Sequence, residues 1–173
     1  EIFEDPSAKG GAFANMYEGT DTSYGKITNG KLHAVIDSGS VITFYHEDGR
    51  VLLKEHFRRL RDEESMPLNI MGREYSNGVG DNFRIVTRFV ARKGEKIFGM
   101  GQYQQHELDL KGCMLELAQR NSQVSVPFYL SSIGYGFLWN NPGVGQVMFA
   151  NNGTEWVTES GKEIDYLVIA GDT

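Results

Sequence analysis

The sequence is poor in cysteine, in basic residues and in long apolar runs, and each shortage excludes a class of protein. Its one cysteine, Cys113, has no second thiol for an internal disulfide, so stability does not require an oxidising compartment. Lysine and arginine number 17 against 23 acidic residues, a net charge of −6, which disfavours binding to nucleic acid. No apolar run approaches the roughly 20 residues of a membrane-spanning helix. We therefore expect neither nucleic acid nor a membrane as a partner.

The two ends of the chain suggest a piece of a longer protein. The chain begins at Glu1 rather than at Met, and it stops at Thr173 directly after an apolar strand pattern. No signal peptide is visible, so a cytoplasmic location is the expectation. At 173 residues the default is one domain, which we place at residues 26–173. Residues 1–25, rich in Gly, Ser and Thr, are expected to form a loosely ordered N-terminal segment.

Glycine is abundant, and it separates short runs that alternate in polarity or are rich in β-branched and aromatic residues. Ser38–Ser40 and Glu47–Gly49 are predicted turns, the second containing the hairpin dipeptide Asp-Gly. Such spacing is typical of sandwiches and barrels, so we predict an all-β, antiparallel domain. The predicted strands are Lys31–Ser38, Val41–Tyr45, Val51–Leu53, Phe83–Ala91, Lys96–Met100, Met114–Ala118, Val126–Ser131, Tyr135–Asn140, Gln146–Phe149, Thr154–Thr158 and Glu163–Ala170.

One segment, Lys54–Glu64, fits two structures. Leu53, Phe57 and Leu60 recur with helical spacing, which favours a short helix. The same residues fit a strand that runs into the acidic loop Arg61–Glu64. The sequence leaves both alternatives open.

No constellation of catalytic or metal-binding residues stands out. The four histidines, His33, His46, His56 and His106, make no paired-ligand spacing, so we predict no metal site and no cofactor. Gly99-Met-Gly101 lacks the third glycine of a phosphate loop, and we interpret it as a tight backbone passage. Asn152-Gly-Thr154 is interpreted as a hairpin turn rather than a glycosylation site. Nothing selects a pair from the candidate carboxylates Glu107, Asp109, Glu116, Asp165 and Asp172.

Aromatic residues gather in the second half of the chain. Phe128, Tyr129, Phe137 and Trp139 lie on two adjacent predicted strands, where alternate positions face a sandwich interior, so we expect them in the core. Trp156 lies on a separate strand and is the better candidate for an exposed or interface aromatic.

The second half also carries a series of linked motifs. They are Ile97-Phe-Gly-Met-Gly-Gln102, the segment Arg120–Ser131 ending in Pro-Phe-Tyr-Leu-Ser, Gly134-Tyr-Gly-Phe-Leu-Trp-Asn-Asn-Pro142, and Ile164-Asp-Tyr-Leu-Val-Ile-Ala-Gly-Asp-Thr173. In order and spacing they resemble the amino-terminal domain of glycoside hydrolase family 31. The first 95 residues resemble that domain only loosely.

The resemblance implies a β-sandwich of the galactose-mutarotase-like (supersandwich) type. It also implies a following (β/α)8 barrel that supplies both catalytic aspartates for retaining hydrolysis of α-linked glucosides or xylosides. The partners would then be the chain's own C-terminal barrel and an oligosaccharide substrate. No catalytic residue is expected within this chain, and an exposed apolar face is expected where the barrel would dock.

A loop of such a sandwich reaches over the barrel mouth in this family. The matching loop here is Ala118–Ser125, and its polar tip consists of Gln119, Arg120, Asn121, Ser122 and Gln123. The resemblance places Asn121 where relatives often carry an Asp or Asn that hydrogen-bonds sugar hydroxyls. From composition alone, the same stretch is a solvated turn.

Two other functions remain open on the same fold. One is a free-standing carbohydrate-binding β-sandwich, which would bind sugar without any further domain. The other is an aldose 1-epimerase, which needs a His and a Glu converging on one sugar.

Overall fold

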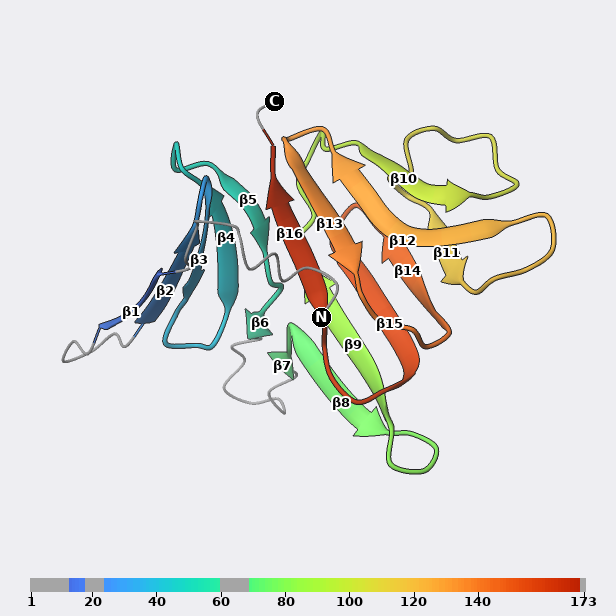
Figure 1. The fold of residues 1–173 in the computed structure, drawn as a ribbon, viewed down its shortest axis with the longest axis horizontal. Helices are drawn as coiled ribbons and strands as arrows, with labels where there is room; N and C mark the ends of the chain where they lie inside the picture. Colours follow the sequence, from blue (N-terminus) through green and yellow to red (C-terminus); the bar gives the residue numbers. More distant parts are fainter. Residues whose placement is uncertain (1–12, 18–23, 60–68, 172–173) are drawn as a thin grey trace, which may run out of the picture.

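The computed structural model describes residues 13–17, 24–59 and 69–171, and its regular structure there consists of β-strands (Figure 1). All paired strands run antiparallel, which confirms the prediction of an all-β antiparallel sandwich. Within the described ranges, no helix has the length and apolarity that crossing a bilayer requires. Of the predicted N-terminal segment, residues 13–17 and 24–25 lie in strands, and the remainder lies outside the described residues.

The first sheet, called here the N-terminal sheet, is a simple meander that stands beside the sandwich (Figure 1). Its hairpin turns use the expected residues: Gly49 has φ 86°, and the Asp37 carboxylate accepts from Gly39 N and Val41 N at 2.9 and 3.0 Å. Its strands are β1 (Phe13–Tyr17), β2 (Tyr24–Asn29), β3 (Leu32–Ile36), β4 (Ile42–His46) and β5 (Val51–Lys54).

One layer of the sandwich has four strands in the order β10-β12-β13-β16, and none of the residues in these strands is charged. We call this layer the uncharged sheet. A bulge lies in β10, where Gly99, Met100 and Gly101 all have positive φ, so the interpretation as a tight backbone passage is confirmed. The strands are β10 (Ile97–Gln102), β12 (Val124–Ser131), β13 (Tyr135–Trp139) and β16 (Tyr166–Ala170).

The opposite layer has five strands in the order β11-β14-β15-β9-β8 and carries acidic and basic residues on most of them. We call it the charged sheet. Its strands are β11 (Met114–Leu117), β14 (Gly145–Phe149), β15 (Thr154–Gly161), β9 (Phe83–Phe89) and β8 (Arg73–Asn77), and a separate short pair consists of β6 (Arg58–Arg59) and β7 (Asn69–Ile70).

The core between the two layers is built around stacked aromatic rings. Phe137 from the uncharged sheet stacks on Trp156 from the charged sheet at 5.2 Å between ring centroids. Tyr129 and Trp139 also stack on Trp156, at 6.2 and 5.6 Å. Rings of this size give the largest apolar burial per residue, so this cluster is the main hydrophobic contribution to the sandwich.

The structure differs from the sequence predictions at several places. Trp156 is buried, so its interpretation as an exposed aromatic is wrong. Phe128 is only half-buried, because it follows the opposite face of β12 from Tyr129, whereas Tyr129 is in the core as predicted. The segment from Lys54 is extended rather than helical as far as Arg59, and its acidic part, residues 61–64, lies outside the described residues. Strand β8 was not predicted, because it is rich in charged and polar residues.

Candidate functional site

The loop between β11 and β12 passes from one sheet of the sandwich to the other. Gln119 closes its base: the side-chain Nε2 donates to Ser125 O at 2.7 Å, and Ser125 N donates to the Gln119 Oε1 at 3.2 Å. At the tip, Gln123 N donates to Arg120 O at 2.9 Å, and Ser122 has φ 74°. The loop is therefore a closed, hydrogen-bonded turn with a defined shape.

Tyr103 braces this loop from the segment that follows β10. Its hydroxyl lies 2.7 Å from Ser125 Oγ and 2.9 Å from Glu116 O. Burial raises the pKa of the Tyr103 hydroxyl, so it remains a neutral donor. The base of the loop is thus held by contacts from three separate segments of the chain.

The five predicted loop residues take different parts in this geometry. Gln119 has its amide engaged in the loop base, and Arg120 forms an ion pair with Glu116, with Nη2 and Oε1 2.5 Å apart. Asn121 and Ser122 are exposed at the tip, and their side chains make no hydrogen bond to any other described residue. The Gln123 side chain is half-buried and also makes no such hydrogen bond, so the side chains of Asn121, Ser122 and Gln123 are available to a ligand, the first two being the more exposed.

A groove of about 740 Å3 lies beside the loop. Gln119 and Ser125 form one side of it, and the connection between β13 and β14 forms the other. The amides of Asn140 and Asn141 on that side are bound to Asp165, at 2.5 and 3.0 Å. The groove combines apolar walls with amide groups, a composition that suits a polyhydroxylated ligand.

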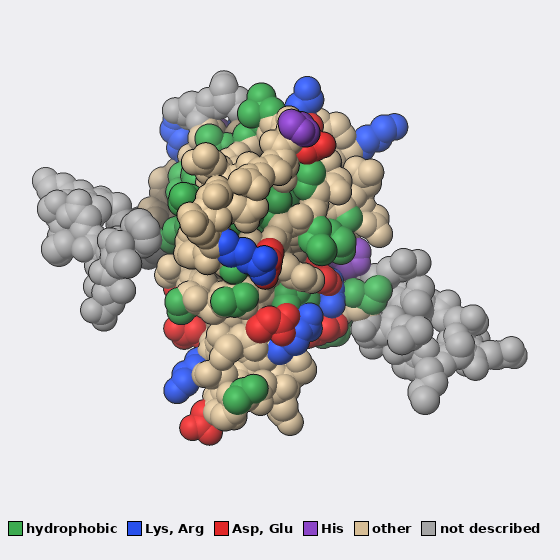
Figure 2. Space-filling model, turned by 90° about the vertical axis from the view of Figure 1, so that its right-hand side faces the viewer, with side chains coloured by type: hydrophobic (Ala, Val, Ile, Leu, Met, Phe, Trp, Pro, Cys, Tyr) green, Lys and Arg blue, Asp and Glu red, His purple; other side chains and the backbone are tan. Residues whose placement is uncertain are grey.

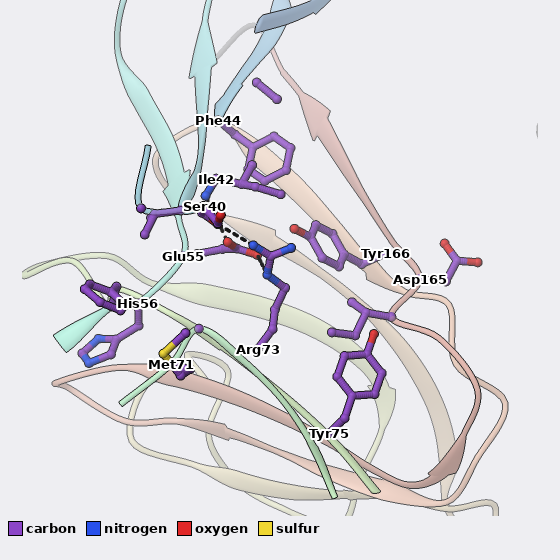
Figure 3. A pocket seen from close by; sticks show the side chains of 16 residues that line it. Ser40, Ile42, Phe44, Glu55, His56, Met71, Arg73, Tyr75, Asp165 and Tyr166 are labelled. Atoms are coloured by element: carbon purple, nitrogen blue, oxygen red, sulfur yellow. Dashed lines mark hydrogen bonds and ion pairs between the residues drawn. The ribbon is translucent and has the colours of Figure 1, made fainter. Parts of the chain in front are cut away.

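A second cavity, of about 690 Å3, lies where the N-terminal sheet meets the sandwich (Figure 3). Glu55 lies in it with only 2% of its surface exposed, and it accepts from Ile42 N at 3.0 Å. Arg73 on β8 approaches the other oxygen of that carboxylate at 3.3 Å and also donates to Ser40 O (Figure 3). These contacts tie two sheets together, so the Glu55–Arg73 pair has a structural role here.

The environment of Glu55 changes its acidity. Burial raises the pKa of the Glu55 carboxyl, although the Ile42 N–H and the Arg73 guanidinium both act to lower it. Burial also raises the pKa of the neighbouring Tyr166 hydroxyl, and the charge of Glu55 adds to this effect. No sequence motif indicates this pair, because Glu55 directly follows β5 whereas Arg73 lies on β8, well apart in the sequence.

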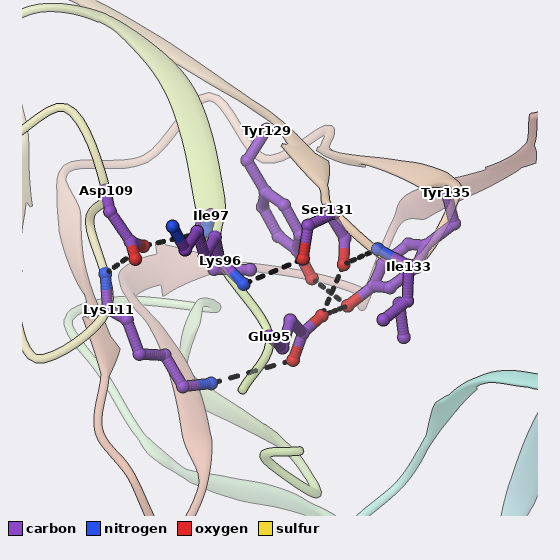
Figure 4. A network of polar contacts seen from close by, with 10 residues as sticks. Glu95, Lys96, Ile97, Asp109, Lys111, Tyr129, Ser131, Ile133 and Tyr135 are labelled. Carbon is purple, nitrogen blue, oxygen red and sulfur yellow. Dashed lines mark hydrogen bonds and ion pairs between the residues drawn. The ribbon is translucent and has the colours of Figure 1, made fainter. Parts of the chain in front are cut away.

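A third polar cluster is enclosed at one end of the sandwich (Figure 4). Glu95 accepts from Ser131 Oγ at 2.6 Å and from Tyr135 OH at 2.9 Å, and Lys111 Nζ lies 3.6 Å from its other oxygen. Tyr135 in turn contacts Tyr129 through their hydroxyls at 3.1 Å (Figure 4). The cluster fastens the β10–β11 connection to the uncharged sheet.

Three of the five candidate carboxylates have structural partners, whereas Glu107 is exposed and makes no hydrogen bond or ion pair with another described residue. Asp109 accepts from Ile97 N and Lys111 N at 3.0 and 3.1 Å. Asp165 holds the two asparagines of the groove, Glu116 pairs with Arg120, and Asp172 lies outside the described residues.

On the end of the molecule seen in Figure 2, acidic and basic side chains are intermixed with apolar ones. Across the described ranges, no group of three or more His, Cys, Asp or Glu residues is placed to hold a metal ion.

Comparisons with known proteins show which proteins this chain is similar to. No protein-family model matches the chain. An uncharacterized family 31 glucosidase from Pseudescherichia vulneris is 45% identical over 158 residues, a match that covers 85% of this chain and 30% of that protein.

Solved structures are similar in fold as well as in sequence. A GH31 α-xylosidase from a soil metagenome, in complex with xylose, superposes with a TM-score of 0.82 at 42% identity. That match covers 97% of this chain and 25% of the xylosidase. A xylosidase from Aspergillus niger superposes with a TM-score of 0.73 at 25% identity, covering 98% of this chain and 26% of its own.

The chain spans less than a third of each of these relatives. The match nevertheless runs through nearly all of the sandwich described above. The chain is a β-sandwich domain of the glycoside hydrolase family 31 type.

Proposed function

We propose that this chain is the non-catalytic amino-terminal domain of a longer α-glycosidase, called here the parent enzyme. The parent enzyme would hydrolyse α-linked glucosides or xylosides with retention of configuration. The domain would support a following (β/α)8 barrel and lend the β11–β12 loop to the substrate pocket. The similarity to an α-xylosidase over 97% of this chain is the observation that carries the proposal.

The geometry of the loop supports the second part of the proposal. A ligand-binding loop works best when its shape is set before the ligand arrives, since less conformational entropy is then lost on binding. The Gln119–Ser125 hydrogen bonds and the Tyr103 brace give this loop such a shape. Asn121 at the exposed tip offers an amide donor and an amide acceptor, which match the hydroxyl groups of a sugar.

Replacing Asn121 by alanine in the parent enzyme tests this role. Losing one hydrogen bond to the leaving-group sugar should lower kcat/KM for a disaccharide by about 1 kcal/mol, roughly five-fold, and leave an aryl glycoside nearly unaffected. Asn151→Ala is the matched control. Asn151 is also exposed, but it lies in the turn after the end of β14, whereas the β11–β12 loop lies near the start of that strand. Equal changes for both substrates, or equal changes in both variants, would remove Asn121 from the site.

A free-standing carbohydrate-binding module is the alternative function. It is favoured by the groove beside the loop, which exists without any further domain. That alternative requires measurable affinity of this chain for xylose or isomaltose by titration calorimetry. The proposal above expects little or none, because the loop would form only one side of the pocket.

A further inference from the structure

The outward face of the uncharged sheet carries no charged side chain and, apart from Gln102 at the end of β10, is apolar. Directly paired residues of neighbouring antiparallel strands project from the same face, so the register identifies the rows of side chains. One row consists of Phe98, Leu130, Gly136 and Ile169, and a second consists of Phe128, Leu138 and Leu167.

These side chains form a continuous surface that is open in this chain. Leu130 is 54% exposed and Ile169 is 52% exposed, although both lie within strands. Gly136 lies beneath its neighbours: a Cβ there would meet the Phe128 ring at 3.2 Å and Leu130 at 3.5 Å. The glycine therefore lets the two larger side chains lie flat across β13. The result is an even apolar surface.

The opposite outer face of the sandwich has a different character. On the charged sheet, Arg88 forms ion pairs with Glu155 at 2.6 Å and with Glu74 at 2.8 Å, and Arg84 pairs with Glu159 at 3.3 Å. Ion pairs between neighbouring strands are usual on a sheet face that is exposed to water. The strands of the uncharged sheet have no such groups on either face. Only one of the two outer faces is therefore suited to water.

We infer that the outward face of the uncharged sheet is the docking surface for the remaining polypeptide of the parent enzyme. This inference rests on the proposed function in taking the chain as one domain of a longer protein. The relatives supply the occupant, since this chain covers only 25% of the soil-metagenome α-xylosidase and 30% of the Pseudescherichia glucosidase. A face without charge can be covered only by an apolar partner surface, as in the core of a permanent interface. The partner segment is therefore expected to present aliphatic and aromatic side chains here.

Cysteine accessibility tests the inference. Leu130→Cys is made in a Cys113→Ser background, and its reaction with a maleimide is followed at that residue by peptide mass spectrometry. The rate is compared between the parent enzyme and this chain alone, at a concentration where the chain sediments as a monomer. Docking predicts a rate at least about ten-fold lower in the parent, since labelling would then require the interface to open. Met148→Cys is the control, because Met148 is 39% exposed on the charged sheet and should react equally in both proteins.

Several results would overturn the inference. These are equal rates at Leu130 in both proteins, protection already present in the monomeric chain, and protection that depends only on the concentration of the isolated chain. The last would mean that the face pairs two copies. Ile169→Cys gives the same readout if Leu130→Cys does not fold. A parent enzyme that hydrolyses α-glycosides but labels freely at Leu130 would contradict the docking surface alone. A protected parent without such activity would contradict the proposed function alone.

Discussion

The side chain of Gln119 and the backbone of Ser125 hold each other through two hydrogen bonds, of 2.7 and 3.2 Å, across the base of the β11–β12 loop. An amide side chain in this position replaces the pair of backbone hydrogen bonds that a continuing ladder would supply. The exposed residues Asn121 and Ser122 lie between these two anchor points. The availability of the loop tip for a ligand therefore depends on a residue that need not touch the ligand.

Replacing Gln119 by leucine should destabilise the domain by about 1–3 kcal/mol, because Ser125 N–H is then left without its partner in a mostly buried position. Urea denaturation of this chain measures the loss. Gln123→Leu is the matched control, since the Gln123 side chain makes no hydrogen bond to another described residue and its loss should cost less than 1 kcal/mol. Equal costs at the two positions would show that the loop base does not hold the loop.

The two tryptophans of the core should respond differently to replacement by phenylalanine. Trp139 Nε1 donates to Thr158 Oγ1 at 3.0 Å, whereas Trp156 Nε1 is buried without a hydrogen-bond partner among the described residues. Both replacements remove a similar volume, but only Trp139→Phe breaks a buried hydrogen bond. The free energy of unfolding should fall by about 1–2 kcal/mol more for Trp139→Phe than for Trp156→Phe. A larger loss for Trp156→Phe would contradict this account of the core.

Stability should depend on pH through Glu55. Burial raises the pKa of this carboxyl above its ordinary value of 4.5, so the folded state holds the proton more tightly than the unfolded state. The resulting stabilisation is complete below pH 4.5 and is lost as the pH rises through the raised folded-state pKa. Glu55→Gln removes this titration, so the variant should lose less stability than the native chain over that range. Urea denaturation at a series of pH values measures the difference, and parallel curves for the two proteins would contradict it.

Strand pattern and glycine spacing were sufficient to predict an all-β antiparallel domain and a tight backbone passage at Gly99–Gly101, whereas the sandwich followed from the resemblance to family 31 and the bulge in β10 is seen only in the structure. The structure explains why both positions are glycine. A Cβ at Gly99 would lie 2.8 Å from the backbone of β12, and a Cβ at Gly101 would lie 2.2 Å from it. Phe137 and Trp139 were placed in the core, because alternation on a strand determines which face a residue occupies. These features follow from local geometry and therefore appear in a single sequence.

Features that depend on the pairing of distant strands could not be predicted. Trp156 was expected to be an exposed or interface residue because it lies on a strand separate from those of the other aromatics, yet that strand lies between β14 and β9 in the middle of the charged sheet. Two features depend on the directions of side chains. One is the ion pair of Glu55 with Arg73, and the other is which residues of the β11–β12 loop are bound at its base and which are exposed at its tip. A one-residue change of register would reverse these directions, so composition alone could not assign them.

Hydrolysis assays on the parent enzyme and on this chain, run in parallel with aryl α-xyloside and aryl α-glucoside, test the central claim most directly. The account predicts that the parent enzyme hydrolyses at least one of the two substrates with retention of configuration, and that this chain alone hydrolyses neither and does not interconvert sugar anomers. Hydrolysis or mutarotation by the chain alone, or a parent enzyme inactive on both substrates, would contradict it.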